Sequence, residues 1–301
     1  MERFFSQIMN RWGVVSAIIE LGRPWNGISV ALLGIIGSII AFQAIPPIPM
    51  LLITGTIIFT IYTGASILND YFDVEVDRIN MPYRPLQKGK INKETALIAS
   101  LIFYCIGIMT PIFISFNFFL AILLMSVLSI IYSAPPFRME SKGFLGNVVL
   151  GVNMIFTSMY SGYVISTNIL IPSAQFLISV GSFTIAFILL NVMKDVKDIQ
   201  GDKMHEKYTV ALGFSKTILV SIGLGGTIMI LISSFIFNMF YFQNVAFVLI
   251  SLGVSIGLVA SIYNLYKKFS PRAGETAWAV TRLLSLIYIL NIFAFSVFTF
   301  I

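Results

Sequence analysis

The chain has 301 residues, of which 57% are hydrophobic and 11% are charged, whereas soluble domains carry about 25% charged residues. With a mean hydropathy of +0.92, the composition excludes ordinary soluble globular proteins and disordered chains. Lys and Arg outnumber Asp and Glu by 19 to 13. In a membrane protein this excess indicates basic cytoplasmic loops and contact with anionic membrane lipids, and we expect no nucleic-acid partner.

Nine apolar runs follow one another along the chain, each about as long as the 20 residues that an α-helix needs to cross a bilayer. The spacing therefore predicts an all-α, polytopic membrane protein with nine transmembrane helices and a single domain over residues 1–301. The runs fall at residues 27–45, 48–68, 95–113, 117–134, 145–165, 172–193, 216–237, 245–265 and 281–301.

The charged side chains predict how these helices are oriented. All 32 lie in the N-terminal segment or in and beside the connections after the second, fourth, sixth and eighth runs. The other connections and the C-terminus carry no charge. The positive-inside rule then puts the N-terminus in the cytoplasm and the C-terminus outside. We expect a multi-pass protein of the cell membrane, with its active site at the cytoplasmic face.

Two of the charged connections contain the same carboxylate pattern. Asp70, Asp73 and Asp77 have the spacing i, i+3, i+7, and the pattern returns 125 residues later. Residues with this spacing share one face of a helix, and Asn69 joins the first set. An acidic, solvated helix end would explain one such motif, but two with identical spacing favour a binding site. The second set is Asp195, Asp198 and Asp202.

Carboxylate clusters of this kind suit Mg²⁺, with Mn²⁺ as the second choice, because both ions prefer oxygen ligands. Mg²⁺ commonly completes its coordination with water and substrate phosphate. Two clusters that face a metal–diphosphate complex offer a way to ionise an allylic diphosphate inside an apolar cavity. Basic residues beside the clusters either hold the diphosphate or contact lipid head groups.

The motifs resemble those of the UbiA superfamily of intramembrane prenyltransferases. Its first signature is similar to Asn69-Asp70-x-x-Asp73-x-x-x-Asp77 with the following Arg78-Ile79-Asn80-x-Pro82-x-Arg84-Pro85. Its second is similar to Asp195-x-x-Asp198-x-x-x-Asp202, and further likeness covers Leu21 to Asn26 and Tyr132 to Asn147. The resemblance implies nine helices bundled around a central lipid cavity, and Mg²⁺-dependent prenyl transfer from an isoprenyl diphosphate donor.

The resemblance also implies a role for each matching residue. The six aspartates would be catalytic. With Asn69, they would hold Mg²⁺ and the diphosphate. Arg84, Arg138 and Lys203 would contact the diphosphate, and Tyr132 would lie near the forming carbocation. Arg23 and Asn26 would face the acceptor. A phosphate on that acceptor would be bound by a basic residue, for which Arg23, Lys142 and Lys203 are the candidates.

The first signature looks most like the branch that contains archaeal digeranylgeranylglyceryl phosphate synthases. The expected reaction is then geranylgeranyl transfer from geranylgeranyl diphosphate to the free hydroxyl of geranylgeranylglyceryl phosphate, a lipid phosphate acceptor, in ether-lipid synthesis. Lys197 and Gln200 depart from that branch, where acidic residues are more common. A superfamily member with an aromatic acceptor of the hydroxybenzoate, homogentisate or chlorophyllide type is the alternative, and a membrane transporter or a lipid-binding scaffold is more remote.

Overall fold

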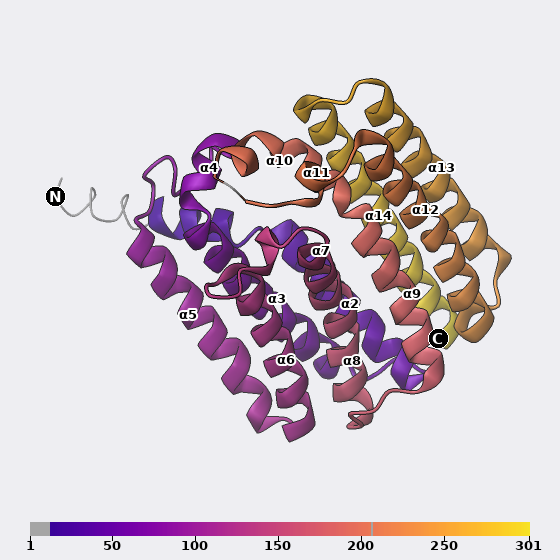
Figure 1. Cartoon of the computed structure of the whole chain (residues 1–301). Helices are drawn as coiled ribbons and strands as arrows, with labels where there is room; N and C mark the ends of the chain where they lie inside the picture. Colours follow the sequence, from indigo (N-terminus) through magenta and orange to yellow (C-terminus); the bar gives the residue numbers. More distant parts are fainter. Residues whose placement is uncertain (1–12, 206) are drawn as a thin grey trace.

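The computed structural model describes residues 13–205 and 207–301, which fold into helices joined by short connections (Figure 1). Residues 13–21 are helical. Within the two described ranges, the only β-structure is an isolated bridge between Lys142 and Tyr208. The following helices are α2 (Pro24–Phe42), α3 (Ile48–Phe72), α4 (Val74–Asn80), α5 (Lys93–Met109), α6 (Phe116–Ser133), α7 (Phe144–Gly151), α8 (Thr157–Thr167), α9 (Ala174–Leu190), α10 (Val192–Met204), α11 (Val210–Gly213), α12 (Lys216–Phe237), α13 (Val245–Lys267) and α14 (Pro271–Phe300).

Nine helical segments of the described residues are long and apolar enough to cross a bilayer, and each coincides with one of the nine apolar runs. The prediction of an all-α polytopic membrane protein is therefore confirmed. The N-terminus, expected in the cytoplasm, falls in residues 1–12 and lies outside the described residues. The spans are Pro24–Phe42, Ile48–Phe72, Lys93–Phe113, Phe116–Ser133, Phe144–Thr167, Ala174–Met204, Lys216–Phe242, Val245–Lys267 and Pro271–Phe300.

Two spans extend well beyond their apolar runs. The sixth continues through α10 to Met204, so that the second carboxylate motif is helical. The ninth begins at Pro271, ten residues before the apolar run, because Ser270 caps the helix by accepting a hydrogen bond from the Ala273 amide. Pro is favoured in the first helical turn, where its missing N–H is not needed. Helix capping, which hydropathy does not report, therefore fixes this boundary.

Small residues bring α2 and α8 into close contact near the centre of the bundle. A Cβ atom on Gly162 would collide with the backbone oxygen of Gly34, and one on Gly37 would collide with the backbone of Met159. The Ser38 hydroxyl donates a hydrogen bond to the Gly162 carbonyl oxygen at 3.1 Å. Close backbone approach of this kind is a common way for membrane helices to associate, since lipid provides little hydrophobic driving force between them.

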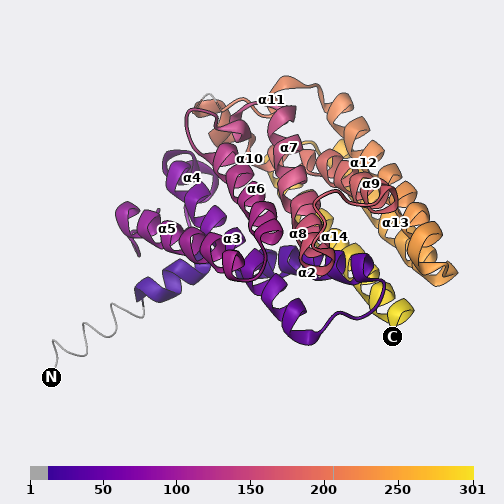
Figure 2. The same cartoon turned by 90° about the horizontal axis from the view of Figure 1, so that it is seen from below.

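The helices are arranged so that the polar elements gather at one end of the bundle. In both views α12, α13 and α14 lie together on one side and α5 lies on the other (Figures 1 and 2). The short helices α4, α10 and α11 are grouped at one end, and the C-terminus lies at the opposite end (Figure 1). The helices α4 and α10 pack against each other, and α10 also packs against α14. This packing brings the two carboxylate motifs to the same end of the molecule.

Candidate active site

A cavity of about 820 Å³ lies inside the bundle, with walls from α2, α3, α4, α6, α7, α9, α10 and α14 and from residues 153–155. The end of the cavity near α4 and α10 is lined by charged side chains. Deeper in the bundle the lining becomes apolar and includes Leu33, Leu150, Met154, Phe187 and Ile289. A cavity with one charged end and one apolar end suits an amphipathic ligand.

The first carboxylate motif follows the end of α3. Asp70 lies on the last turn of α3, Asp73 occupies the break between α3 and α4, and Asp77 lies on α4. All three line the cavity and are at most 6% exposed. Asp73 is the only residue between the two helices, and backbone hydrogen bonds from Asp73 to Asn69 and from Asp77 to Asp73 bridge the break. The three carboxylates and Asn69 therefore face the same space, as the spacing predicted.

Two arginines neutralise the outer carboxylates of this motif. Arg84 pairs with both Asp70, at 2.7 Å, and Asp77, and Arg23 pairs with Asp70. Burial raises the pKa of Asp77 to about 6, although the neighbouring Arg84 opposes the shift. The predicted residues Arg23 and Arg84 thus lie at the charged end of the cavity, and each forms an ion pair with at least one carboxylate.

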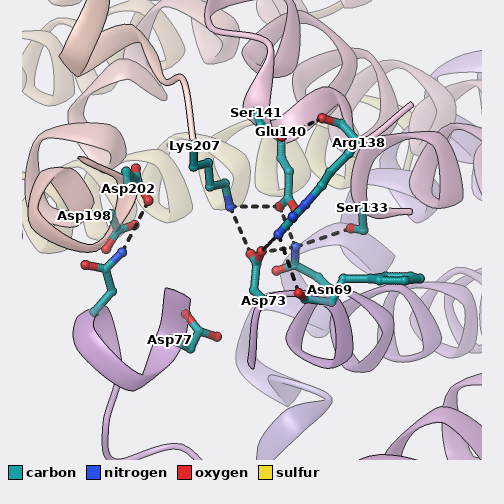
Figure 3. Close-up of polar contacts among 12 residues, drawn as sticks. Asn69, Asp73, Asp77, Ser133, Arg138, Glu140, Ser141, Asp198, Asp202 and Lys207 are labelled. Atoms are coloured by element: carbon teal, nitrogen blue, oxygen red, sulfur yellow. Dashed lines mark hydrogen bonds and ion pairs between the residues drawn. The ribbon is translucent and has the colours of Figure 1, made fainter. Parts of the chain in front are cut away.

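A second network surrounds Asp73 (Figure 3). Its carboxylate accepts hydrogen bonds from Arg138 at 2.8 Å and Lys207 at 3.0 Å. Lys207 also pairs with Glu140 at 3.2 Å, and Asn69 donates to Glu140 at 2.8 Å. Four polar side chains from three separate segments thus converge around one carboxylate.

Burial and ion pairing act in opposite directions on the acids of this network. Burial, reinforced by Asp73, raises the pKa of Glu140 to about 7, against the effect of Lys207. Burial also favours the neutral form of Asp73, but Lys207 and Arg138 outweigh it and lower the pKa of Asp73. The two basic groups therefore favour the anionic form of Asp73 at the charged end of the cavity.

The second motif lies on α10 and divides into two environments. Asp198 and Asp202 line the cavity, and Asp198 pairs with Lys197 at 2.9 Å. Asp195 is not part of the cavity lining, and its carboxylate accepts a hydrogen bond from the backbone amide of Val210 at 3.3 Å. Asp195 thus anchors the start of α11, in contrast to the ligand role that the motif suggested.

The remaining predicted residues separate into two groups. Asn26 and Tyr132 line the cavity, on α2 and α6. Lys142 and Lys203 are exposed and lie outside its lining. The structure therefore brings Asn26 and Tyr132 to the carboxylate motifs and leaves these two lysines apart from them.

Four residues to which the sequence assigned no role belong to the charged end. Asn80 and Lys194 line the cavity, Lys207 lines it and bridges two acids, and Glu140 lies behind Asp73. Asn80 continues the helical face of Asp73 and Asp77, and Lys194 adjoins Asp195, so spacing offered a signal for both. Lys207 comes from a loop and Glu140 from a short turn, where helical spacing offers none.

The donor set at this end of the cavity fits Mg²⁺. Within residues 13–205 and 207–301, no three Asp, Glu, His or Cys side chains converge on a ready-made metal site. Mg²⁺ does not need such a cluster, because one or two carboxylates with water and substrate phosphate complete its coordination. Asp73 and Asp77 on one wall and Asp198 and Asp202 on the other supply oxygen ligands of the required kind.

Comparison with known proteins agrees with this geometry. The model of the UbiA prenyltransferase family matches residues 30–296. A digeranylgeranylglyceryl phosphate synthase from Pyrococcus abyssi is 33% identical over 216 residues, which cover 69% of this chain and 73% of that protein. One from Thermococcus gammatolerans is 26% identical over 292 residues, which cover 93% and 96%.

Solved structures share the fold. A structure of a digeranylgeranylglyceryl phosphate synthase superposes with a TM-score of 0.66 at 20% identity and covers 94% of this chain and 98% of its own. A UbiA homolog from Archaeoglobus fulgidus bound to DMAPP and Mg²⁺ superposes with a TM-score of 0.60 at 17% identity, over 92% and 99%. The chain belongs to the UbiA prenyltransferase family and is a membrane-embedded prenyltransferase.

Proposed function

We propose that the protein transfers a geranylgeranyl group from geranylgeranyl diphosphate to the free hydroxyl of geranylgeranylglyceryl phosphate and releases diphosphate. The observation that carries this proposal is the cavity, in which two carboxylate-bearing walls face each other above an apolar interior. The relatives that are digeranylgeranylglyceryl phosphate synthases support the choice of acceptor. The whole chain acts as one prenyltransferase unit.

At the charged end, the side chains bind and orient the diphosphate of the donor. Arg84, Lys194 and Lys207 line the cavity and supply positive charge to an anion held between α4 and α10. Asp73, Asp77, Asp198 and Asp202 would hold Mg²⁺, which when bound neutralises charge on the diphosphate and makes it a better leaving group. Arg138 keeps Asp73 ionised and in place.

The apolar interior protects the reactive end of the donor from water. The bond between C1 of the prenyl chain and the diphosphate oxygen breaks, the electron pair leaves with diphosphate, and an allylic cation remains. The ring of Tyr132, which lines the cavity, stabilises this cation through its π-electrons. The acceptor hydroxyl oxygen then bonds to C1, and its proton passes to a cavity carboxylate or to the departing diphosphate.

We also propose that the active site opens at the cytoplasmic face of the cell membrane. All charged side chains of the sequence fall in the N-terminal segment or in or beside the connections assigned to that face, and positive charge is retained on the cytoplasmic side. Soluble, charged diphosphate would then be released into the cytoplasm.

The decisive test compares acceptors. Purified protein in detergent is incubated with geranylgeranyl diphosphate, Mg²⁺ and either geranylgeranylglyceryl phosphate or 4-hydroxybenzoate, and mass spectrometry identifies the product. An ether-lipid product that is lost with chelator supports the proposal. A product formed only with the aromatic acid would support prenyl transfer but would contradict geranylgeranylglyceryl phosphate as the acceptor.

A further inference from the structure

The phosphate of the proposed acceptor needs a cation that is separate from those on the donor diphosphate. Three basic residues were expected to provide it. Arg23 lies on Asp70, where it is held by an ion pair. Lys142 and Lys203 are exposed and lie outside the cavity lining. Of these three residues only Arg23 lines the cavity, at the charged end that would hold the donor diphosphate, so a separate cation would come from another part of the cavity wall.

One face of α14 provides such a wall. The residues of α14 that line the cavity recur every three or four positions, and they form a continuous stripe along the helix. The charged residues of this stripe lie in its N-terminal part and its C-terminal end is apolar, so Arg282 is the last charged residue before the apolar interior. The stripe comprises Glu275, Trp278, Ala279, Thr281, Arg282, Ser285, Leu286 and Ile289.

Arg282 is an unusual residue for this position. It lies twelve residues into a 30-residue membrane span, and no charged residue follows it in the chain. Within the described parts of the chain it makes no ion pair with an acid. A guanidinium in a membrane span is costly unless it faces a polar cavity or an anion. Arg282 meets the first condition, because it lines the cavity. A bound anion would meet the second.

The neighbouring Thr281 gives an independent indication of a polar ligand. Its side chain is 2% exposed, lines the same cavity and has no hydrogen-bond partner for its hydroxyl in the described structure. Helical threonines usually satisfy the hydroxyl on the backbone of the preceding turn, as Thr227 and Thr276 do here. A buried hydroxyl without a partner is unfavourable, and a ligand that accepts a hydrogen bond from Thr281 would remove this cost.

The packing of α14 sets the depth of this polar pair. Gly274 contacts α10 at Val196 and Lys197, level with the second carboxylate motif. Arg282 follows eight residues later, or about 12 Å along the axis at a rise of about 1.5 Å per residue. Helical side chains lean toward the N-terminus, which directs this long side chain back toward the charged end. Arg282 itself is exposed and lines the cavity between the second carboxylate motif and Ile289, which belongs to the apolar interior.

We propose that Arg282, with the hydroxyls of Thr281 and Ser285, binds the phosphomonoester of the acceptor lipid. This inference rests on the proposed function. An arginine binds two oxygens of a phosphate through parallel hydrogen bonds. The reacting hydroxyl of the acceptor is on the carbon next to the one that carries the phosphate, so an anchored phosphate places that hydroxyl near the donor C1. Separate cations for the two substrates keep the acceptor from occupying the donor's diphosphate site.

The test compares geranylgeranylglyceryl phosphate with geranylgeranylglycerol, which lacks the phosphate, in a detergent free of phospholipid. The quantity measured is the ratio of kcat/KM for the two acceptors. Arg282→Gln is expected to lower this ratio about 10- to 100-fold, as for loss of a charged hydrogen bond. Arg272→Gln is the control, because Arg272 lies on the same helix but outside the cavity lining, and it should keep the wild-type ratio.

Two further variants keep the test informative if Arg282→Gln does not fold. Arg282→Lys, which keeps the charge but not the paired donors, is expected to lower the ratio less, and Thr281→Val is expected to lower it a few-fold. A wild-type ratio in these variants, or an equal loss with both acceptors, overturns the proposal. Failure of the proposed function is seen separately, as absence of transfer to geranylgeranylglyceryl phosphate in the wild-type protein, and it overturns this inference as well. Restored affinity on adding anionic phospholipid to the variants would assign the site to a head group instead, and so contradict it.

Discussion

Asn80 joins the two carboxylate motifs. Its side-chain amide donates to the Asp202 carboxylate at 3.3 Å, and its oxygen accepts the backbone N–H of Gly201 at 2.9 Å. Gly201 has no side chain at this contact, and a Cβ atom there would collide with the Asn80 amide. One residue on α4 therefore fixes the position of α10, and with it the separation of the two walls that face the diphosphate.

Replacement of Asn80 by Ala should impair catalysis more than stability. The change removes both hydrogen bonds, leaves the Gly201 amide without this acceptor and lets α10 move relative to α4. We expect kcat/KM to fall about 10-fold or more and the Mg²⁺ concentration for half-maximal rate to rise. Asn244→Ala is the control, because it removes the N-cap of α13 and should cost about 1 kcal/mol of stability. An equal rise in Mg²⁺ requirement in both variants would show that general destabilisation is the cause.

Acidic residues that line the cavity should be distinguishable from one that does not. Asp73→Asn and Asp198→Asn are each expected to reduce kcat on the order of 100- to 1,000-fold, because each removes charge from a site that holds a metal–diphosphate complex. Glu75 lies on α4 but is exposed and pairs with Arg78, so Glu75→Gln should retain activity. Chelator should abolish turnover of the wild-type protein, and added Mg²⁺ should restore it. Full activity in the presence of excess chelator would contradict the metal assignment.

Lys207 should matter for stability through the two acids that it bridges. Lys207→Met leaves Glu140 without its closest cation and weakens the pairing of Asp73, and breaking a buried ion pair costs about 3–5 kcal/mol. We therefore expect a clear fall in Tm, measured in detergent. Adding Glu140→Gln removes one of the uncompensated charges, so the double variant should recover part of the loss. A double variant that is less stable than Lys207→Met alone would refute this coupling.

The positions of the helices could be predicted from the sequence because hydropathy reports burial in lipid, and all nine apolar runs became spans. The ends of the helices depend on local chemistry instead. The ninth span starts at a serine cap followed by proline, so Glu275 and Trp278, which precede the ninth apolar run, lie on a helix and not in a loop. Helical spacing also predicted that Asp70, Asp73 and Asp77 share a face, since α3 and α4 are nearly continuous.

Lys207 was harder to predict because it comes from a loop. Lys142 and Tyr208 form an isolated β-bridge, and the Gly143 amide donates to the Tyr208 carbonyl oxygen at 2.9 Å. Successive side chains on an extended segment point to opposite sides, so Lys207 faces the cavity and Tyr208 is exposed. Lys142 and Tyr208 are 66 residues apart in the sequence, and no periodicity in either loop indicates their pairing. The same limit applies to Asp195, whose bond to the Val210 amide depends on where α11 begins.

The proposed orientation can be tested with single cysteines, because Cys105 is the only natural one. In a Cys105→Ala background, Lys88→Cys lies in an exposed loop at the charged end, and Ile171→Cys lies in the connection between α8 and α9, where the native side chain is 81% exposed. The positive-inside rule places Lys88 in the cytoplasm. A membrane-impermeant maleimide applied to intact cells should therefore label the Ile171→Cys protein and should label the Lys88→Cys protein only after permeabilisation. The reverse pattern would place the diphosphate-binding end outside the cell, away from a cytoplasmic supply of the donor, and would contradict the proposed location of the active site.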